Sequence, residues 1–407
     1  MIRRWLTGLL AVAVALPPAV LASAPAAIAA PDNCAQAGQE YPAIPWQQQL
    51  LAADRVRTFS RGTGVTVAVL ASGVDANQPQ LHGHVVAGFD ATTGNGPANT
   101  DCAGLGTQIA GVIAAQPVNG AGLVGLAPNV TILPVRVVAN TLLGTPEAGP
   151  AVLAKGIAWA AEHGADVIDV PLVTHTNDPA LLAAVADAQA HGALVIAGTG
   201  AVGSVGDTGG TPYPAGYDGV LGVGAVDQNV NRYTGSPVGS WIALVAPGAG
   251  VVTLQRDHGM IPVDGTGIAS AFVAATAALV RARIGESATP DVIRHRLFAT
   301  ATPTPGGPAF GHGLVNPYAA VTEQLAAGSP VALPAMTRPA GEDAQDDALR
   351  RTRAAIGTGV GLLVVLVVLL AALALPRGRR RRWRPALAPA PPPRPDPEPG
   401  PPVQLFD

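Results

Sequence analysis

The chain has 407 residues, a formal net charge of −3 and 13% charged residues. Its near-neutral balance excludes a global polyanion or polycation as partner, so nucleic acid is not expected. The length allows two or three domains, but both ends have compositions that are not those of a globular domain.

Residues 1–30 are predicted to be a secretory signal peptide. Arg3 and Arg4 precede an apolar stretch at residues 9–20, and the small residues at 27–29 suit a cleavage site. An uncleaved anchor remains the alternative. In either case the large domain that follows is expected outside the cytoplasm.

The two cysteines, Cys34 and Cys102, both fall in the exported part. An even count in an oxidising compartment favours a disulfide, which would stabilise the fold by about 4 kcal/mol in the chain-entropy model. A two-cysteine metal site is the competing interpretation, but no His/Cys spacing supports it.

Residues 31–61 are predicted to be an N-terminal extension and residues 62–325 a single α/β domain. Runs of Val, Ile and Ala predict strands, and Ala-rich stretches between them predict helices. Alternation of the two favours a mostly parallel sheet with helices on both faces. The expected strands are 65–70, 130–138, 166–170, 193–197 and 220–226, and the expected helices are 107–115, 150–163 and 179–190.

The C-terminal part is predicted to cross a membrane once. Residues 326–353 are expected to form a stalk, and residues 354–376 are long and apolar enough for a transmembrane helix. The tail, 377–407, begins with a basic run, typical of the cytoplasmic side, and becomes proline-rich. The predicted localisation is therefore the cell membrane, single-pass, with the large domain on the extracytoplasmic side.

Three separated segments share one pattern. Residues 67–74 read Val-Ala-Val-Leu-Ala-Ser-Gly-Val, residues 101–107 read Asp-Cys-Ala-Gly-Leu-Gly-Thr, and residues 265–271 read Gly-Thr-Gly-Ile-Ala-Ser-Ala. They resemble the Asp, His and Ser motifs of the subtilisin-like (S8) serine proteases, with Ala71, Leu105 and Gly267 at the positions of the triad.

The resemblance covers most of residues 31–325. The Ala-Pro turn and strand at 127–137, the segments at 213–215, 220–225 and 246–248, and the closing Gly-x-Gly-x-Val at 311–315 follow the family's order. The arrangement of signal peptide, extension, body and span resembles the mycosins, which are associated with type VII (ESX) secretion. This resemblance implies a subtilisin-like three-layer fold, a Cys34–Cys102 disulfide and the type VII membrane complex as partner.

Ala, Leu and Gly cannot supply the carboxylate, imidazole and hydroxyl of a Ser-His-Asp mechanism. The oxyanion-hole asparagine corresponds to Ala201, which lacks the donor. We therefore expect no catalytic residues and no enzyme activity: a pseudoprotease acting as a structural or binding component of type VII secretion. No cofactor and no metal are expected, since no acidic cluster has Ca²⁺-ligand spacing.

Two alternatives remain open. The first is an active S8 endopeptidase with a remodelled site, for which Asp75, His82, His84 and Ser270 are the nearby candidates; Ser270 lies about 5 Å along the helix from the nucleophile's position. The second is a non-cleaving receptor for exported peptides. It would use the old substrate groove at Pro171, Leu172 and Val173, where Pro171 lacks an N–H for strand addition.

Overall fold

The computed structural model describes residues 34–138, 148–201, 210–304, 306–325 and 342–380. It divides into two compact units, Met1–Ala326 and Ala327–Asp407. The predicted signal peptide, most of the stalk and the tail beyond residue 380 lie outside the described residues, and their bounds remain predictions.

The first unit is built on a parallel sheet of seven strands in the order β2-β3-β1-β4-β5-β6-β7. Nearly every residue of the central strands is buried, because helices cover both faces and apolar residues therefore run continuously along each strand. The strands are β1 (Thr66–Ala71), β2 (Phe89–Asp90), β3 (Thr131–Arg136), β4 (Val167–Val170), β5 (Leu194–Gly198), β6 (Leu221–Val226) and β7 (Ile242–Pro247).

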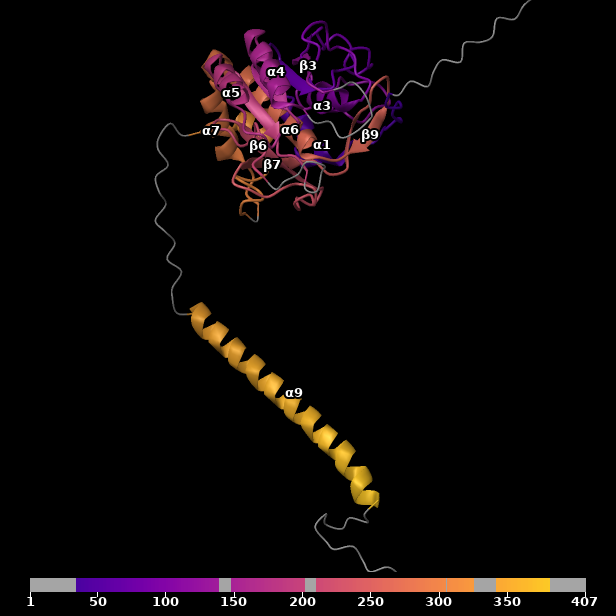
Figure 1. Ribbon diagram of the computed structural model, residues 1–407, viewed down its shortest axis with the longest axis vertical. Coiled ribbons are helices and arrows are strands. Elements are labelled where there is room, and N and C mark those ends of the chain that lie inside the picture. Colours follow the sequence, from indigo (N-terminus) through magenta and orange to yellow (C-terminus); the bar gives the residue numbers. More distant parts are fainter. Residues whose placement is uncertain (1–33, 139–147, 202–209, 305, 326–341, 381–407) are drawn as a thin grey trace, which may run out of the picture. The chain divides into compact units, whose positions relative to one another are not determined.

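Alternate residues of β1 enter two different cores. Val67, Val69 and Ala71 face a cluster shared with α3 (Leu105–Ala114) and α6 (Thr266–Ile284). Ala68 and Leu70 face a second cluster shared with α4 (Pro150–Glu162) and α5 (Pro179–Ala190). The result is the three-layer α/β architecture expected from the sequence (Figure 1).

Helix α6 is the long buried helix of the first layer. It is apolar enough to span a membrane, yet most of it is buried inside the domain, so it is a core helix. The remaining elements are a hairpin of β8 (Val251–Leu254) and β9 (Met260–Val263), the short helix η1 (Gly285–Ser287), α7 (Pro290–Thr300) and α8 (Pro317–Thr322).

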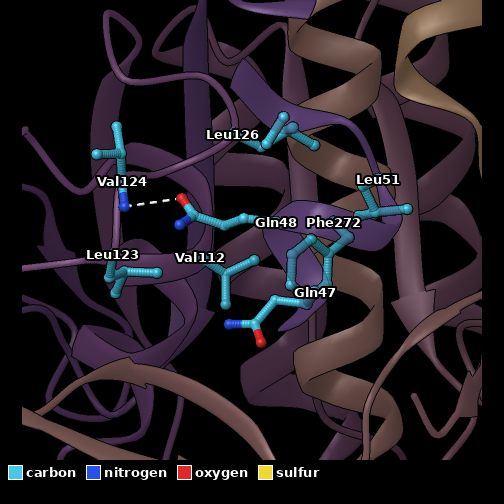
Figure 2. A pocket seen from close by; sticks show the side chains of 9 residues that line it. Gln47, Gln48, Leu51, Val112, Leu123, Val124, Leu126 and Phe272 are labelled. Carbon is cyan, nitrogen blue, oxygen red and sulfur yellow. Dashed lines mark hydrogen bonds between the residues drawn. The ribbon is translucent and has the colours of Figure 1, made fainter. Parts of the chain in front are cut away.

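The N-terminal extension is fixed to the body by side-chain amides. In α1 (Trp46–Leu50), Gln47 donates to the carbonyl of Val252 and Gln48 pairs with the backbone of Gly122 and Val124. Figure 2 shows these amides beside Phe272 of α6, around a small cavity of about 10 Å³. The extension, which also contains α2 (Ala53–Val56), therefore packs against the body of the domain.

The second unit contains α9 (Glu342–Arg380), and its residues Leu349–Leu373 form a candidate membrane span with none of the span buried. The span overlaps the predicted one and begins a few residues earlier. This difference follows from the helix continuing through Arg350, Arg351 and Arg353 before its uncharged part begins.

Candidate active site

The three positions that the sequence predicts to correspond to the triad lie at element ends. Ala71 is the last residue of β1, Leu105 the first of α3, and Gly267 the second of α6. In a parallel sheet, the carboxyl ends of strands and the N-termini of the following helices meet at one edge, where α/β proteins place their sites. The three positions therefore belong to the edge at which a catalytic site is expected.

Packing is close between the end of β1 and the start of α3. Ala71 is fully buried, and a Cβ on Gly106 would lie 3.3 Å from the Cβ of Ala71. Leu105 is partly buried and packs against both apolar cores. These side chains contribute apolar packing where a proton relay would need polar groups.

Asp101 is the polar centre of this part of the edge. It is 4% exposed and accepts hydrogen bonds from the Ser72 hydroxyl (2.8 Å), the Gly104 amide (2.8 Å), and the amide and hydroxyl of Thr107 (2.9 and 2.8 Å). Burial raises the pKa of the Asp101 carboxyl, while these hydrogen bonds act in the opposite direction. Asp101 thereby joins the segment after β1 to the first turn of α3.

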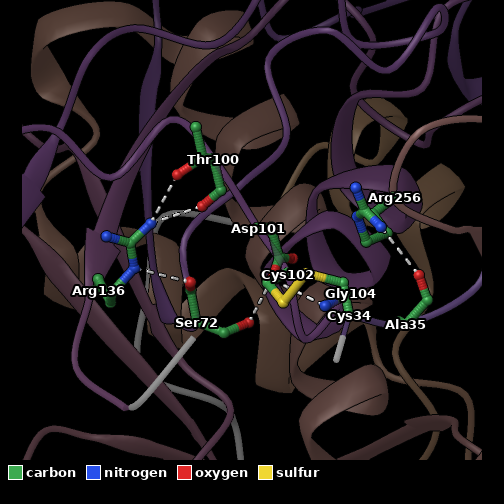
Figure 3. The surroundings of a disulfide bond; sticks show 9 residues. All are labelled: Cys34, Ala35, Ser72, Thr100, Asp101, Cys102, Gly104, Arg136 and Arg256. Atoms are coloured by element: carbon green, nitrogen blue, oxygen red, sulfur yellow. Dashed lines mark hydrogen bonds between the residues drawn. A yellow bond between two sulfur atoms is a disulfide. The ribbon is translucent and has the colours of Figure 1, made fainter. Parts of the chain in front are cut away.

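The disulfide lies next to Asp101, and the expected pairing is confirmed: Cys34 is bonded to Cys102. Figure 3 shows the extension held here by a further contact, in which Arg256 donates to the carbonyl of Ala35 (3.1 Å). The amide of Ala35 in turn donates to the carbonyl of Cys102 (2.8 Å). The disulfide thus anchors the extension three residues before Leu105.

A salt-bridged arginine supports the same region from the sheet. Arg136, at the end of β3, forms a salt bridge with Asp90 (2.7 Å) and donates to the carbonyls of Ser72 (3.0 Å) and Thr100 (2.7 Å). Arg136 therefore holds the segment after β1 and the segment before Asp101 through their backbone carbonyls (Figure 3).

The α6 side of the edge is filled by Pro171. A Cβ added to Gly267 would lie 2.6 Å from the carbonyl oxygen of Pro171 and 2.8 Å from its Cβ. A real Cβ essentially never comes this close to another atom, so the present backbone accepts only glycine at position 267. The close approach of Pro171 was not predictable from the sequence pattern.

Asp169 lies beneath this contact and was not singled out from the sequence. It is fully buried in β4, and neither of its carboxylate oxygens has a hydrogen-bond partner among the described residues. Burial raises the pKa of Asp169 to about 8. Its neighbour Ser270 directs its hydroxyl to the carbonyl of Gly267 (2.9 Å). The available signal was an acid inside an otherwise apolar strand.

The predicted groove residues are only partly available. Pro171 and Leu172 are buried, and a Cβ on Gly200 would lie 2.9 Å from a methyl group of Val173. The chain then pairs at Thr174 with Tyr213. Ala201 is exposed after β5, beyond Gly200, whose carbonyl accepts the Thr266 hydroxyl (2.9 Å).

The residues considered for a remodelled site do not converge. Ser270 is fully buried. The carboxylate of Asp75 accepts hydrogen bonds from the backbone amides of Asn77 and Asp257. His82 is exposed, and a ring nitrogen of His84 lies 3.3 Å from the carbonyl of Val130. Within the described part of the chain, no group of three His, Cys, Asp or Glu side chains is placed to hold a metal ion.

Comparison with known proteins identifies the class. The sequence profile of the subtilase family (peptidase S8) matches residues 62–326, and the chain belongs to this family. Subtilisin DY from Bacillus licheniformis is 36% identical over 278 residues, covering 68% of this chain and 98% of the relative. Thermitase from Thermoactinomyces vulgaris is 35% identical over 275 residues, covering 67% and 94%.

Among solved structures, the chain is similar to those of mycosins. MycP1 from Mycobacterium smegmatis has a TM-score of 0.65 and 27% identity, covering 75% of this chain and 92% of that one. The MycP3 protease from the type VII (ESX-3) secretion system has a TM-score of 0.61 and 29% identity, covering 72% and 92%. The resemblance to subtilases and mycosins is thus confirmed.

The prediction that the chain is not an enzyme is wrong on this comparison. Its relatives are proteases, among them subtilisin DY, thermitase and the MycP3 protease, and nothing in the family match sets this chain apart. The prediction rested on three side chains, whereas family membership rests on the whole domain. The term pseudoprotease is accordingly withdrawn.

Proposed function

We propose that this chain is a membrane-anchored, mycosin-like subtilase that works with a type VII secretion complex. The observation that carries the proposal is the combination, in one chain, of a domain like MycP1 and MycP3 with the candidate span Leu349–Leu373. The proposed topology places the domain outside the cytoplasm and the basic tail inside, following the predicted signal peptide and the run at residues 377–384.

In this proposal, Ala71, Leu105 and Gly267 correspond to the triad positions and Ala201 to the oxyanion position. Their side chains can pack but cannot transfer a proton. Peptide hydrolysis by this domain therefore has to use other groups. The segment Pro171–Val173 is proposed as the remnant of the substrate groove, with exported peptides as its ligands.

Copurification tests the partner. The tagged full-length chain would be isolated from its native membrane in mild detergent, and its partners would be identified by mass spectrometry. We expect type VII membrane components at stable ratios. A matched control chain that lacks residues 349–373 is expected to be absent from the membrane fraction and to recover no type VII membrane components. Recovery of the full-length chain without those components contradicts the proposed partner.

A second function, cleavage of exported peptides, is favoured by the family itself. Incubation of the purified domain with a peptide library, followed by mass spectrometry, tests it. Products that form with the folded domain and not with the heat-denatured domain support cleavage. The Ser270→Ala variant is expected to cleave as the parent does, because Ser270 is buried and bonded to Gly267. An absence of products contradicts this second function.

A further inference from the structure

A basic hollow lies between the end of the N-terminal extension and the C-terminal end of α6. It encloses about 340 Å³ and is lined by Arg57, Thr58, Phe59, Ser60, Arg61, Thr63, Ala282 and Arg283. Three of these are arginines, and no acidic side chain lines the hollow within the described part of the chain. The lining therefore favours an anionic ligand.

The three arginines differ in whether their guanidinium groups can contact a ligand. Arg57 is buried and committed internally, since it pairs with Asp54 and donates to the carbonyls of Val124 and Gly125. Arg61 is exposed, and its ε nitrogen donates to the side-chain oxygen of Asn129. Arg283 is exposed on the last turn of α6. Arg61 and Arg283 can thus present guanidinium groups to an incoming anion.

An exposed aromatic side chain accompanies these cations. Phe59 is 47% exposed and packs edge-to-face on Tyr318 of α8, with ring centroids 5.8 Å apart. The guanidinium of Arg55 lies 4.4 Å from the centre of the same tyrosine ring. Arginines beside an exposed aromatic ring are the combination that peripheral proteins use at anionic lipid surfaces.

The chain connectivity also favours lipid over an acidic peptide. Helix α8 packs against α2 and α6, so the chain leaves the domain beside the hollow. Residues 326–348 then join this face to the candidate span Leu349–Leu373. The basic hollow therefore lies on the face of the domain from which the chain continues toward a candidate span.

We propose that this hollow, defined by Arg61, Arg283 and Phe59, binds anionic phospholipid headgroups, with Phe59 entering the interfacial region. The inference rests on the proposed membrane anchoring. It also orients the domain: Gly267 and Arg283 lie near opposite ends of α6, about 25 Å apart at the rise of an α-helix. The candidate active site is then turned away from the lipid surface.

Vesicle flotation with the isolated domain, residues 34–325, tests the proposal. This part is expected to fold alone, because its apolar cores are internal and subtilisin DY consists almost entirely of the matching domain. We expect binding to phosphatidylcholine vesicles that contain about 30% phosphatidylglycerol, little binding to phosphatidylcholine alone, and release by salt.

Charge reversal provides the decisive comparison. R61E/R283E is expected to reduce binding at least about tenfold, since each basic residue near an anionic surface contributes roughly fivefold. F59A should give a smaller loss. The matched control K155E reverses an exposed charge on α4 and should bind normally. Unchanged thermal unfolding of each variant ensures that binding is what has changed.

Three outcomes overturn the inference: equal binding to neutral vesicles, unchanged binding by R61E/R283E, or binding to polyglutamate without binding to vesicles. The last would assign the hollow to an acidic protein partner. Because the isolated domain lacks α9, these results are independent of whether the full-length chain is anchored. Carbonate extraction of the full-length chain tests anchoring separately.

Discussion

Two aspartates at the candidate site are both buried, but they differ in the hydrogen bonds that their carboxyl groups receive. Asp101, between β1 and α3, receives four hydrogen bonds, whereas Asp169 in β4 receives none from the described residues. A buried carboxylate is tolerated in its charged form only where donors replace water. The β1–α3 side is thus held together by hydrogen bonds to a buried carboxyl group, and the β4–α6 side packs around a buried carboxyl group without such bonds.

Removing the saturated carboxylate should have the largest effect. Asp101→Ala leaves the donors of Ser72, Gly104 and Thr107 without their acceptor in a buried place. We expect a loss of about 3–5 kcal/mol in the free energy of unfolding, measured by urea denaturation. Asp178→Ala, which removes the partly buried N-cap of α5, is the control and should cost only about 1 kcal/mol. Equal losses for the two variants would contradict the role given to Asp101.

Breaking the Cys34–Cys102 disulfide should also destabilise the β1–α3 side of the candidate site. The bond joins residues 68 positions apart, so the Cys34→Ser/Cys102→Ser variant should lose about 4 kcal/mol in the chain-entropy model. Reduction of the parent protein should give a similar loss. Proteolysis should then cut first in the extension, near Ala35. If the extension is not cut, the hydrogen bonds of Gln47 and Gln48 are sufficient to hold it on the domain without the disulfide.

The unsatisfied aspartate predicts an effect of the opposite sign. Because the folded-state pKa of Asp169 is about 8, well above its ordinary value, its neutral form contributes fully at low pH. This contribution is lost as the pH rises from about 4 to about 8. Asp169→Asn should therefore stabilise the fold at pH 7 by about 2–4 kcal/mol and flatten the pH dependence. Parallel pH profiles for parent and variant would refute this.

The smallest expected effect tests the contact between Gly267 and Pro171. Gly267→Ser places a Cβ against Pro171 and should destabilise the fold by about 1–3 kcal/mol. Pro171→Gly in the same chain removes the ring and frees the segment to move, so it should recover part of the loss. If Gly267→Ser alone is as stable as the parent, Pro171 does not restrict this position.

Much of the fold was predictable because periodicity and composition report burial. The helix at Pro179–Ala190 matches the prediction in full, and the predicted strands agree with β1, β3, β4, β5 and β6 within about two residues at each end. The helix 107–115 begins earlier than predicted, at Leu105, since Gly104 with its positive φ ends the preceding turn. The β8–β9 hairpin and helices α1 and α2 were missed because tertiary contacts hold these short elements.

The sequence predicts positions for the site, but it does not predict the contacts that these positions make. Sequence motifs located Ala71, Leu105 and Gly267, and the structure places all three at element ends on the expected edge. The packing of Pro171 on Gly267 joins two segments far apart in the sequence, so no local pattern reports it. The expectation of no enzyme failed because a conclusion about activity was drawn from these positions alone.

The central claim is that this chain serves type VII secretion from the membrane. The most direct test deletes its coding sequence in the native host and measures export of type VII substrates into the medium. We predict that export falls, that the full-length chain restores it, and that a variant lacking residues 349–373 does not. Undiminished export in the deletion strain would contradict the account.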